Sequence, residues 1–71
     1  MSDSVYRGTE VIGTSDESWE AAARNAVTTA GHTIRDLRVA EATHFDVTVK
    51  DGKIADYRVR LDISFKYEAA D

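Results

Sequence analysis

The strongest constraint in this sequence is the pair Asp51-Gly52, which lies between two long stretches of alternating polar and apolar residues. A two-residue hairpin turn of the primed type needs positive φ angles, and Asp-Gly is one of the strongest signals for it. From Ala55 to Tyr67 the odd positions are apolar or aromatic and the even ones polar or charged. This period of two is typical of a strand with one buried face. We therefore expect a β-hairpin over residues 39–67.

The length of the turn also predicts which side chains share a face of this hairpin. A two-residue loop pairs Lys50 with Lys53 and sets the register of the ladder. A three-residue loop would shift one arm and change the partition. With the two-residue loop, one face is mostly apolar, and the small side chains on its first arm leave room for a helix to pack. This face consists of Ala40, Ala42, His44, Val59, Leu61 and Ile63. The opposite face then mixes apolar side chains with charges of both signs: Val39, Glu41, Thr43, Phe45, Val47, Val49, Arg58, Arg60 and Asp62.

One helix cannot cover both faces of such a sheet. The second face is therefore expected to contact something else, and Phe45 and Val47 are predicted to lie at contacts between copies of the chain. With 71 residues the chain is predicted to be a single domain spanning residues 1–71. A core of this size is marginal, and the sequence contains no cysteine for a disulfide. Oligomerisation is the remaining way to stabilise it.

The first half of the chain predicts a strand followed by a helix. Residues 5–12 form the expected strand, which Gly13 ends. Thr14 and Glu17 have the spacing of a capping box, so the helix is expected to begin there. Apolar side chains with a period of 3.6 predict that it runs to about Leu37, with Gly31 as a point of close packing. The apolar stripe consists mostly of alanine: Trp19, Ala22, Ala23, Ala26, Val27, Ala30, Ile34 and Leu37.

The order of the predicted elements is β-α-β-β, which indicates an α+β fold. The strand–helix–strand connection leaves the first two strands pointing the same way, and the hairpin reverses the third. Placing the third strand in the middle gives an antiparallel three-stranded sheet of order 1-3-2. Both outer strands are then edge strands, whose unpaired backbone groups need either a pairing partner or a feature that prevents aggregation.

Composition excludes several classes of function. The net charge of −4 argues against general affinity for nucleic acid or anionic lipid. No signal peptide or membrane-spanning apolar run is visible, and the lack of cysteine fits a reducing compartment, so we expect a cytoplasmic protein. His32 and His44 are separated in sequence, and no acid–base–nucleophile set is visible, so catalysis is not expected.

For two sets of charged residues, ligand binding is an alternative to a purely structural role. Asp16, Glu17 and Glu20 have oxygen ligands of the kind that Ca²⁺ prefers, although interaction with the helix dipole explains them more simply. Arg7 and Lys66 lie on strands expected to be neighbours and could meet a phosphate, or they could be two solvated cations.

Several short motifs together resemble the dodecin family. They are Tyr6-Arg7, Gly13-Thr14-Ser15, the alanine-rich helix, Leu37-Arg38-Val39-Ala40-Glu41 and Ser64-Phe65-Lys66, and they cover nearly the whole chain. The resemblance implies a curved antiparallel sheet wrapped around one helix. It also implies a hollow homododecameric shell that stores flavin, either riboflavin or FMN, at contacts between subunits and is not an enzyme.

The resemblance also assigns candidate ligand-binding residues. Val39 occupies the position of the Trp that stacks on the flavin ring, and Arg58 that of a Gln at the polar edge of the ring. Arg7 and Lys66 match basic positions near the flavin phosphate. Residues 18–20 and 38–41 resemble a subgroup that lacks this Trp and has a calcium-binding member. Two functions therefore remain: a flavin store, or a shell that assembles without flavin and binds calcium or another small ion.

Overall fold

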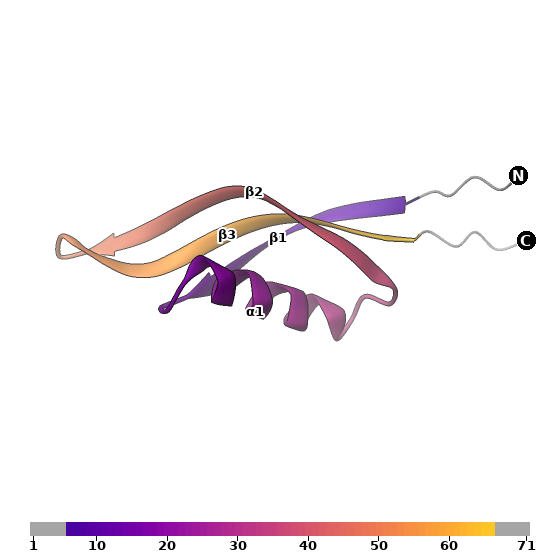
Figure 1. Ribbon diagram of the computed structural model, residues 1–71, viewed down its shortest axis with the longest axis horizontal. Helices are drawn as coiled ribbons and strands as arrows, with labels where there is room; N and C mark the ends of the chain where they lie inside the picture. The colour runs from indigo at the N-terminus through magenta and orange to yellow at the C-terminus, as the bar shows by residue number, and fades with distance from the viewer. Residues whose placement is uncertain (1–5, 67–71) are drawn as a thin grey trace, which may run out of the picture.

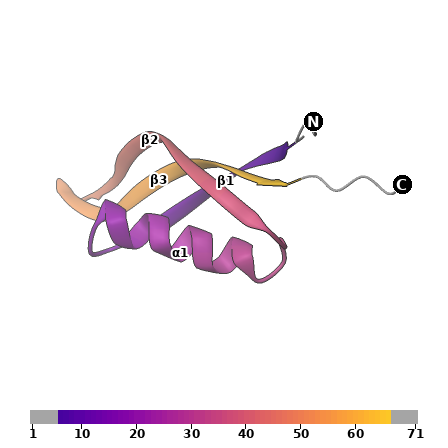
Figure 2. The ribbon, with the colours of Figure 1, turned by 45° about the vertical axis from the view of Figure 1, so that its right-hand side comes forward.

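A computed structural model describes residues 6–66 of the chain, and the side chains of residues 8–65. The elements follow the predicted β-α-β-β order, so the α+β fold is confirmed (Figure 1). They are β1 (Tyr6–Ser15), α1 (Trp19–Gly31), β2 (Leu37–Lys50) and β3 (Lys53–Lys66). The strand order is β1-β3-β2, and both outer strands run antiparallel to β3. The strands bend across one side of α1, which lies beneath them in both ribbon views (Figures 1 and 2).

The hairpin turn has the predicted geometry. Asp51 and Gly52 have φ angles of 53° and 76°, so both central residues have the positive φ of a type I′ turn. Lys50 pairs with Lys53, as the two-residue loop requires. The β2–β3 hairpin therefore begins in the expected register.

The ladder does not keep this register along its whole length. Of its three register shifts, one leaves Arg38 as an extra residue at the start of β2. In the body of the hairpin, one shift leaves Ala55 of β3 as an extra residue, and a second leaves Thr43 of β2 as an extra residue. Each is a bulge that displaces the pairing by one position, and the second cancels the first. The displaced pairs between them are His44 with Arg60, Phe45 with Val59, Asp46 with Arg58, Val47 with Tyr57, and Thr48 with Asp56.

This displacement changes which side chains face α1. We call the side of the sheet that faces α1 the helix face, and the other side the outer face. Ala40 lies opposite Ile63, as predicted. Phe45 lies opposite the buried Val59 and so belongs to the helix face, whereas His44 lies opposite Arg60 on the outer face. The predicted faces of His44, Phe45, Val47 and Val49 were wrong, because the alternation of polar and apolar residues gives no sign of the bulge at Thr43.

The helix is shorter than predicted at both ends. Its N-cap is Ser18, whose Oγ accepts a hydrogen bond from the N–H of Ala21 at 3.0 Å. The predicted capping box of Thr14 and Glu17 is wrong, because β1 continues through Ser15. The helix ends at Gly31, and Leu37 is the first residue of β2.

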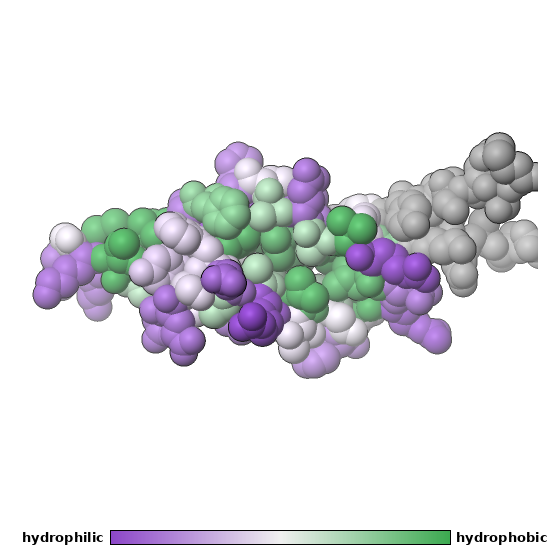
Figure 3. All heavy atoms as spheres, viewed as in Figure 1, coloured by the Kyte–Doolittle hydropathy of each residue, from purple (hydrophilic) through white to green (hydrophobic). Residues whose placement is uncertain are grey.

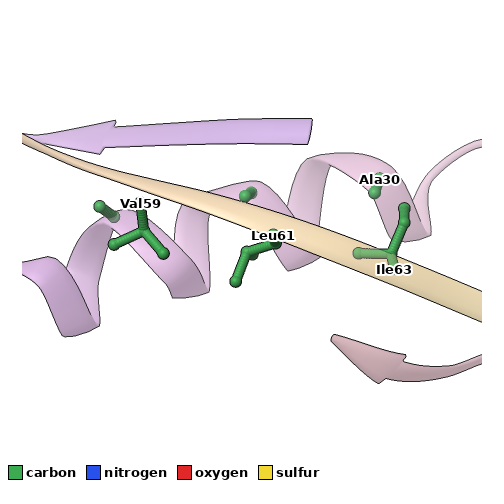
Figure 4. Packing of buried hydrophobic residues seen from close by; sticks show 6 residues of the cluster. Ala30, Val59, Leu61 and Ile63 are labelled. Atoms are coloured by element: carbon green, nitrogen blue, oxygen red, sulfur yellow. The ribbon is translucent and has the colours of Figure 1, made fainter. Parts of the chain in front are cut away.

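The core is a thin layer between α1 and β3. Its buried helix residues are all alanines, and these pack against branched side chains of the central strand (Figure 4). The small methyl groups allow α1 to lie close to the sheet. The buried set is Ala22, Ala26, Ala30, Val59, Leu61 and Ile63. Among residues 6–66 no helix is long and apolar enough to cross a membrane.

Gly13 is the point of closest approach between β1 and α1. The prediction that Gly13 ends the strand was wrong, because Gly13 lies within β1 and pairs with Val59. A Cβ at this position would lie 2.8 Å from the Cβ of Ala26 and would overlap the backbone oxygen of Ala22. By contrast, a Cβ at Gly31 would meet no described atom within 4 Å. The close-packing role expected for Gly31 therefore belongs to Gly13.

We predict that Gly13→Ala destabilises the fold by about 1–3 kcal/mol, the usual cost of overpacking a core. The methyl group would push against helix backbone, which cannot move aside as a flexible side chain can. Gly31→Ala is the matched control, and it should be neutral or stabilising by up to about 1 kcal/mol, because alanine favours helix. Urea unfolding at fixed protein concentration measures both. Equal effects of the two substitutions would contradict the packing role of Gly13.

Candidate functional site

The outer face contains a cavity of about 350 Å³ that spans all three strands. Within residues 6–66 no other element covers this face. Val39 lies in the cavity wall and is 55% exposed, and its role as a ligand contact stays a prediction. The other lining residues are Gly8, Thr9, Glu10, Glu41, Asp62, Ile63 and Ser64.

Three carboxylates cross this cavity in a single row. Asp62 of β3 pairs with Glu10 of β1 on one side and with Glu41 of β2 on the other. Like charges directly opposite one another are destabilising in a sheet. We call these residues the acidic row. Sequence patterns did not reveal it, because it depends on the registers of two strand pairs at once.

A neighbouring arginine compensates the acidic row only in part. The Nε of Arg60 lies 3.9 Å from the Oε1 of Glu10, at the outer limit of an ion pair. This Nε is buried and has no hydrogen-bond partner in the described part of the chain. Within residues 8–65 no group of three His, Asp or Glu side chains is arranged to hold a metal ion. The row therefore gives the cavity negative potential but is not a preformed metal site within one copy.

Arg58 and Asp46 form the best-defined ion pair of the outer face. The Nε and Nη2 of Arg58 donate to the two carboxylate oxygens of Asp46 at 2.8 and 3.0 Å. These hydrogen bonds lower the pKa of Asp46 below its ordinary value of 3.8 and raise the pKa of Arg58. Both side chains remain substantially exposed. The pair depends on the displaced register, because the straight register would place Arg58 opposite Phe45.

The structure does not bring the two main candidate residues together within one copy. Val39 pairs with Ser64, and Arg58 lies further along β3. At about 3.3 Å per residue, positions 58 and 64 of β3 are roughly 20 Å apart. Both lie on the outer face, as predicted, but a single small ligand can touch both only if they come from different copies.

The other candidate residues have different outcomes. Arg7 pairs with Phe65, and Lys66 with Tyr6, but the side chains of Arg7 and Lys66 lie outside the described ones. Their contact with a phosphate therefore stays a prediction. Of the acidic residues near the helix start, only Glu20 lies in the first turn of α1.

An aromatic cluster near the start of α1 was missed by the sequence analysis. The Trp19 ring lies edge-on to Phe45 and Tyr57, with centroid distances of 6.0 and 5.0 Å. Its Nε1 donates to the backbone oxygen of Asp46 at 3.0 Å. Phe45 is nevertheless 59% exposed, so the cluster leaves much of this ring accessible. The role of Phe45 and Val47 at a contact between copies stays a prediction, now on the helix face.

The Arg58–Asp46 pair predicts an acid-sensitive contact on the outer face. Because the pKa of Asp46 is lowered in the folded protein, the pair is fully formed above the ordinary value of 3.8 and is lost as the pH falls below it. The Nε–H NMR signal of Arg58 should therefore titrate with a midpoint below pH 3.8, and Asp46→Asn should abolish this titration. A midpoint at or above 3.8 would contradict the pairing.

Comparison with known proteins agrees with this architecture. The model of the Dodecin family matches residues 5–68. Calcium dodecin from Mycobacterium tuberculosis is 42% identical over 67 residues, which cover 94% of each chain. Dodecin from Thermus thermophilus is 34% identical over 64 residues, covering 90% of this chain and 93% of the relative.

Solved structures give the same result. Dodecin from Streptomyces coelicolor superposes with a TM-score of 0.91 and 41% identity, covering 99% of this chain and 100% of its own. The Mycobacterium tuberculosis calcium dodecin, described as a calcium-chelating antigen with a novel calcium-binding site, has a TM-score of 0.81 and 39% identity. That match covers 94% of this chain and 96% of the other. The α+β fold, the element order and these matches show that the chain belongs to the dodecin family.

Proposed function

We propose that this protein is a non-catalytic storage protein that binds a small ligand at contacts between copies, within a closed homododecameric shell of single-domain subunits. The observation that carries this proposal is the outer face, where a cavity and an exposed Val39 are left open by every described element. Membership of the dodecin family supports the shell. The absence of cysteine supports a cytoplasmic setting.

The dimensions of the chain support assembly. The Cα radius of gyration is 14.9 Å, whereas a compact domain of this length has about 11 Å. Half of the buried apolar set is alanine, which contributes little apolar area. A monomer this elongated, with so small a core, is expected to gain much of its stability from contacts with other copies.

A flavin is the first candidate ligand, since it is the ligand that the family resemblance implies. Val39 offers no aromatic face for stacking, so flavin binding should be weak. The acidic row lines the same cavity and repels a phosphate. Riboflavin, which has no phosphate, is therefore the flavin that this cavity favours over FMN. A phosphate contact by Arg7 and Lys66 would work in the opposite direction.

Calcium is the second candidate, and the acidic row is the observation that favours it. Ca²⁺ takes six to eight oxygen ligands, often from carboxylates. Glu10, Asp62 and Glu41 supply carboxylates in one cavity, and a relative 42% identical to this chain is called calcium dodecin. Because these groups are not arranged as a metal site within one copy, the remaining oxygens would come from another copy or from water.

We predict that the purified protein is a large closed oligomer in physiological salt. Multi-angle light scattering after size exclusion should give about twelve times the mass of the 7.9 kDa chain, without larger species. Dilution should not yield a folded monomer, because the isolated core is too small. A stable, folded monomer across the concentration range would contradict the shell.

We predict that Val39→Trp strengthens riboflavin binding by roughly one to two decades. An aromatic side chain supplies stacking of about 1–3 kcal/mol, and each decade of affinity corresponds to 1.4 kcal/mol. The double variant Val39→Trp with Arg58→Gln should bind more tightly still, because it replaces a long side chain that would crowd the ring with a shorter one. Quenching of riboflavin fluorescence during titration measures all three proteins.

The same titrations distinguish the two candidate ligands. FMN should bind the wild-type protein more weakly than riboflavin does, and the difference should shrink when Glu41→Gln is introduced. Calorimetry with CaCl₂, using Asp62→Asn as the matched variant, tests the acidic row directly. Wild-type protein that binds riboflavin as tightly as the double variant would show that positions 39 and 58 do not form the flavin site.

A further inference from the structure

The β2–β3 hairpin extends well beyond the helix that packs on it. Each arm has 14 residues and is about 46 Å long, whereas the 13 residues of α1 span about 20 Å. The uncovered part carries an apolar stripe on the helix face. We call this stripe the hairpin overhang, and it consists of Phe45, Val47, Val49, Ile54 and Tyr57.

Three side chains of the hairpin overhang are exposed in spite of being apolar, namely Phe45, Val49 and Ile54, and Val47 and Tyr57 are half-buried. Val49 and Ile54 face each other across the ladder and are 64% and 54% exposed. Hydrophobic side chains gather near the hairpin end of the molecule, next to hydrophilic ones at the tip (Figure 3). Within one copy, Trp19 is the described helix side chain whose ring contacts the near end of the stripe, through Phe45 and Tyr57.

An apolar groove opens between α1 and β2, and we call it the α1–β2 groove. It exists because α1 packs mainly over β1 and β3, so it leaves the helix face of β2 open. Its volume is about 480 Å³. Most of the lining consists of small or branched apolar side chains: Ala23, Val27, Ala40, Ala42 and Leu61. The polar lining residues are Glu20, Arg24 and Thr28, all on α1.

The groove and the overhang are complementary in shape and in charge. The overhang projects branched side chains, and the groove has a floor of alanines that leaves room for them. Lys50 and Lys53 flank Asp51 at the hairpin tip, which leaves the tip with net positive charge. Glu20 and Arg24 line the groove and Glu17 lies just before the helix, so this end of the groove has net negative charge. Net charges of opposite sign would therefore meet if the tip lay beside Glu17 and Glu20.

The hairpin cannot fill the groove of its own chain. Ala42 in the groove and Val49 in the overhang belong to the same strand, β2, and are separated by roughly 23 Å along it. A continuous, paired strand cannot fold back over itself by that distance. The occupant must come from another molecule, and a second copy of this chain carries a matching surface.

We propose that the hairpin overhang of one copy packs into the α1–β2 groove of the next, head to tail. This inference rests on the proposed shell and names one of its contacts. The two surfaces are different, so the contact is heterologous, and it closes into a ring when the rotation between copies permits. Phe45 and Val47 then lie at a contact between copies through the helix face of the hairpin.

Two variants test the contact from its two sides. The hairpin variant Val49→Asp with Ile54→Asp removes the apolar stripe, and the groove variant Ala42→Trp fills the groove. All three positions are exposed, so the core is unchanged, and far-UV circular dichroism should retain the helix signal. Light scattering should show that each variant alone loses the wild-type mass.

Mixing the two variants supplies the decisive measurement. The hairpin variant keeps an intact groove, and the groove variant keeps an intact hairpin. They should therefore bind each other one to one, which calorimetry detects, although neither extends to the full shell. Matched controls should assemble as the wild type does: Ala42→Ser keeps the groove open, and Val49→Ile with Ile54→Val keeps the stripe apolar.

Each alternative outcome is distinct. Variants that keep the full wild-type mass would overturn the contact while leaving the shell intact. Variants that lose it but do not bind each other would also overturn it, since the hairpin would then pack against some surface other than the groove. A monomeric wild-type protein would instead contradict the proposed shell itself.

Discussion

The displaced register in the middle of the β2–β3 hairpin determines what each face of the sheet presents. With extra residues at Thr43 and Ala55, Phe45 comes to lie on the helix face and Asp46 comes to lie beside Arg58. A straight ladder would place an aromatic ring next to a guanidinium on the outer face instead. The two bulges thus separate an apolar stripe from a charged surface, and both the ion pair and the aromatic cluster around Trp19 depend on that separation.

The close approach of α1 to the sheet is the second constraint. It requires alanines along the helix and the absence of a side chain at Gly13, which faces Ala22 and Ala26. Such packing gives a thin core with little buried apolar area, so the free energy of unfolding of a single copy is expected to be small. Because α1 is shifted toward β1 and β3, it also leaves Ala40 and Ala42 of β2 uncovered. Because α1 packs tightly over β1 and β3 and not over the middle of the whole sheet, the α1–β2 groove lies along its other side.

Most of the topology could be read from the sequence, because it depends on local signals. The type I′ turn at Asp51-Gly52 and the alternation along β3 predicted the hairpin, the central strand and the α+β fold correctly. The start of the helix was missed because Thr14 and Ser18 are both good caps, and only the pairing of β1 with β3 selects Ser18. Bulges and the acidic row depend on registers between strands, so no pattern within a single strand reveals them.

The two faces of the sheet are suited to different interactions. The outer face has a cavity with net negative charge and ion pairs, so it suits a small ligand whose binding responds to charge. The helix face has exposed branched side chains and an alanine-lined groove, so it suits extensive packing against another protein surface. Substitutions on one face should then leave the other intact, except at Asp46. This residue pairs with Arg58 on the outer face through its carboxylate and accepts from Trp19 through its backbone oxygen, so it links the two.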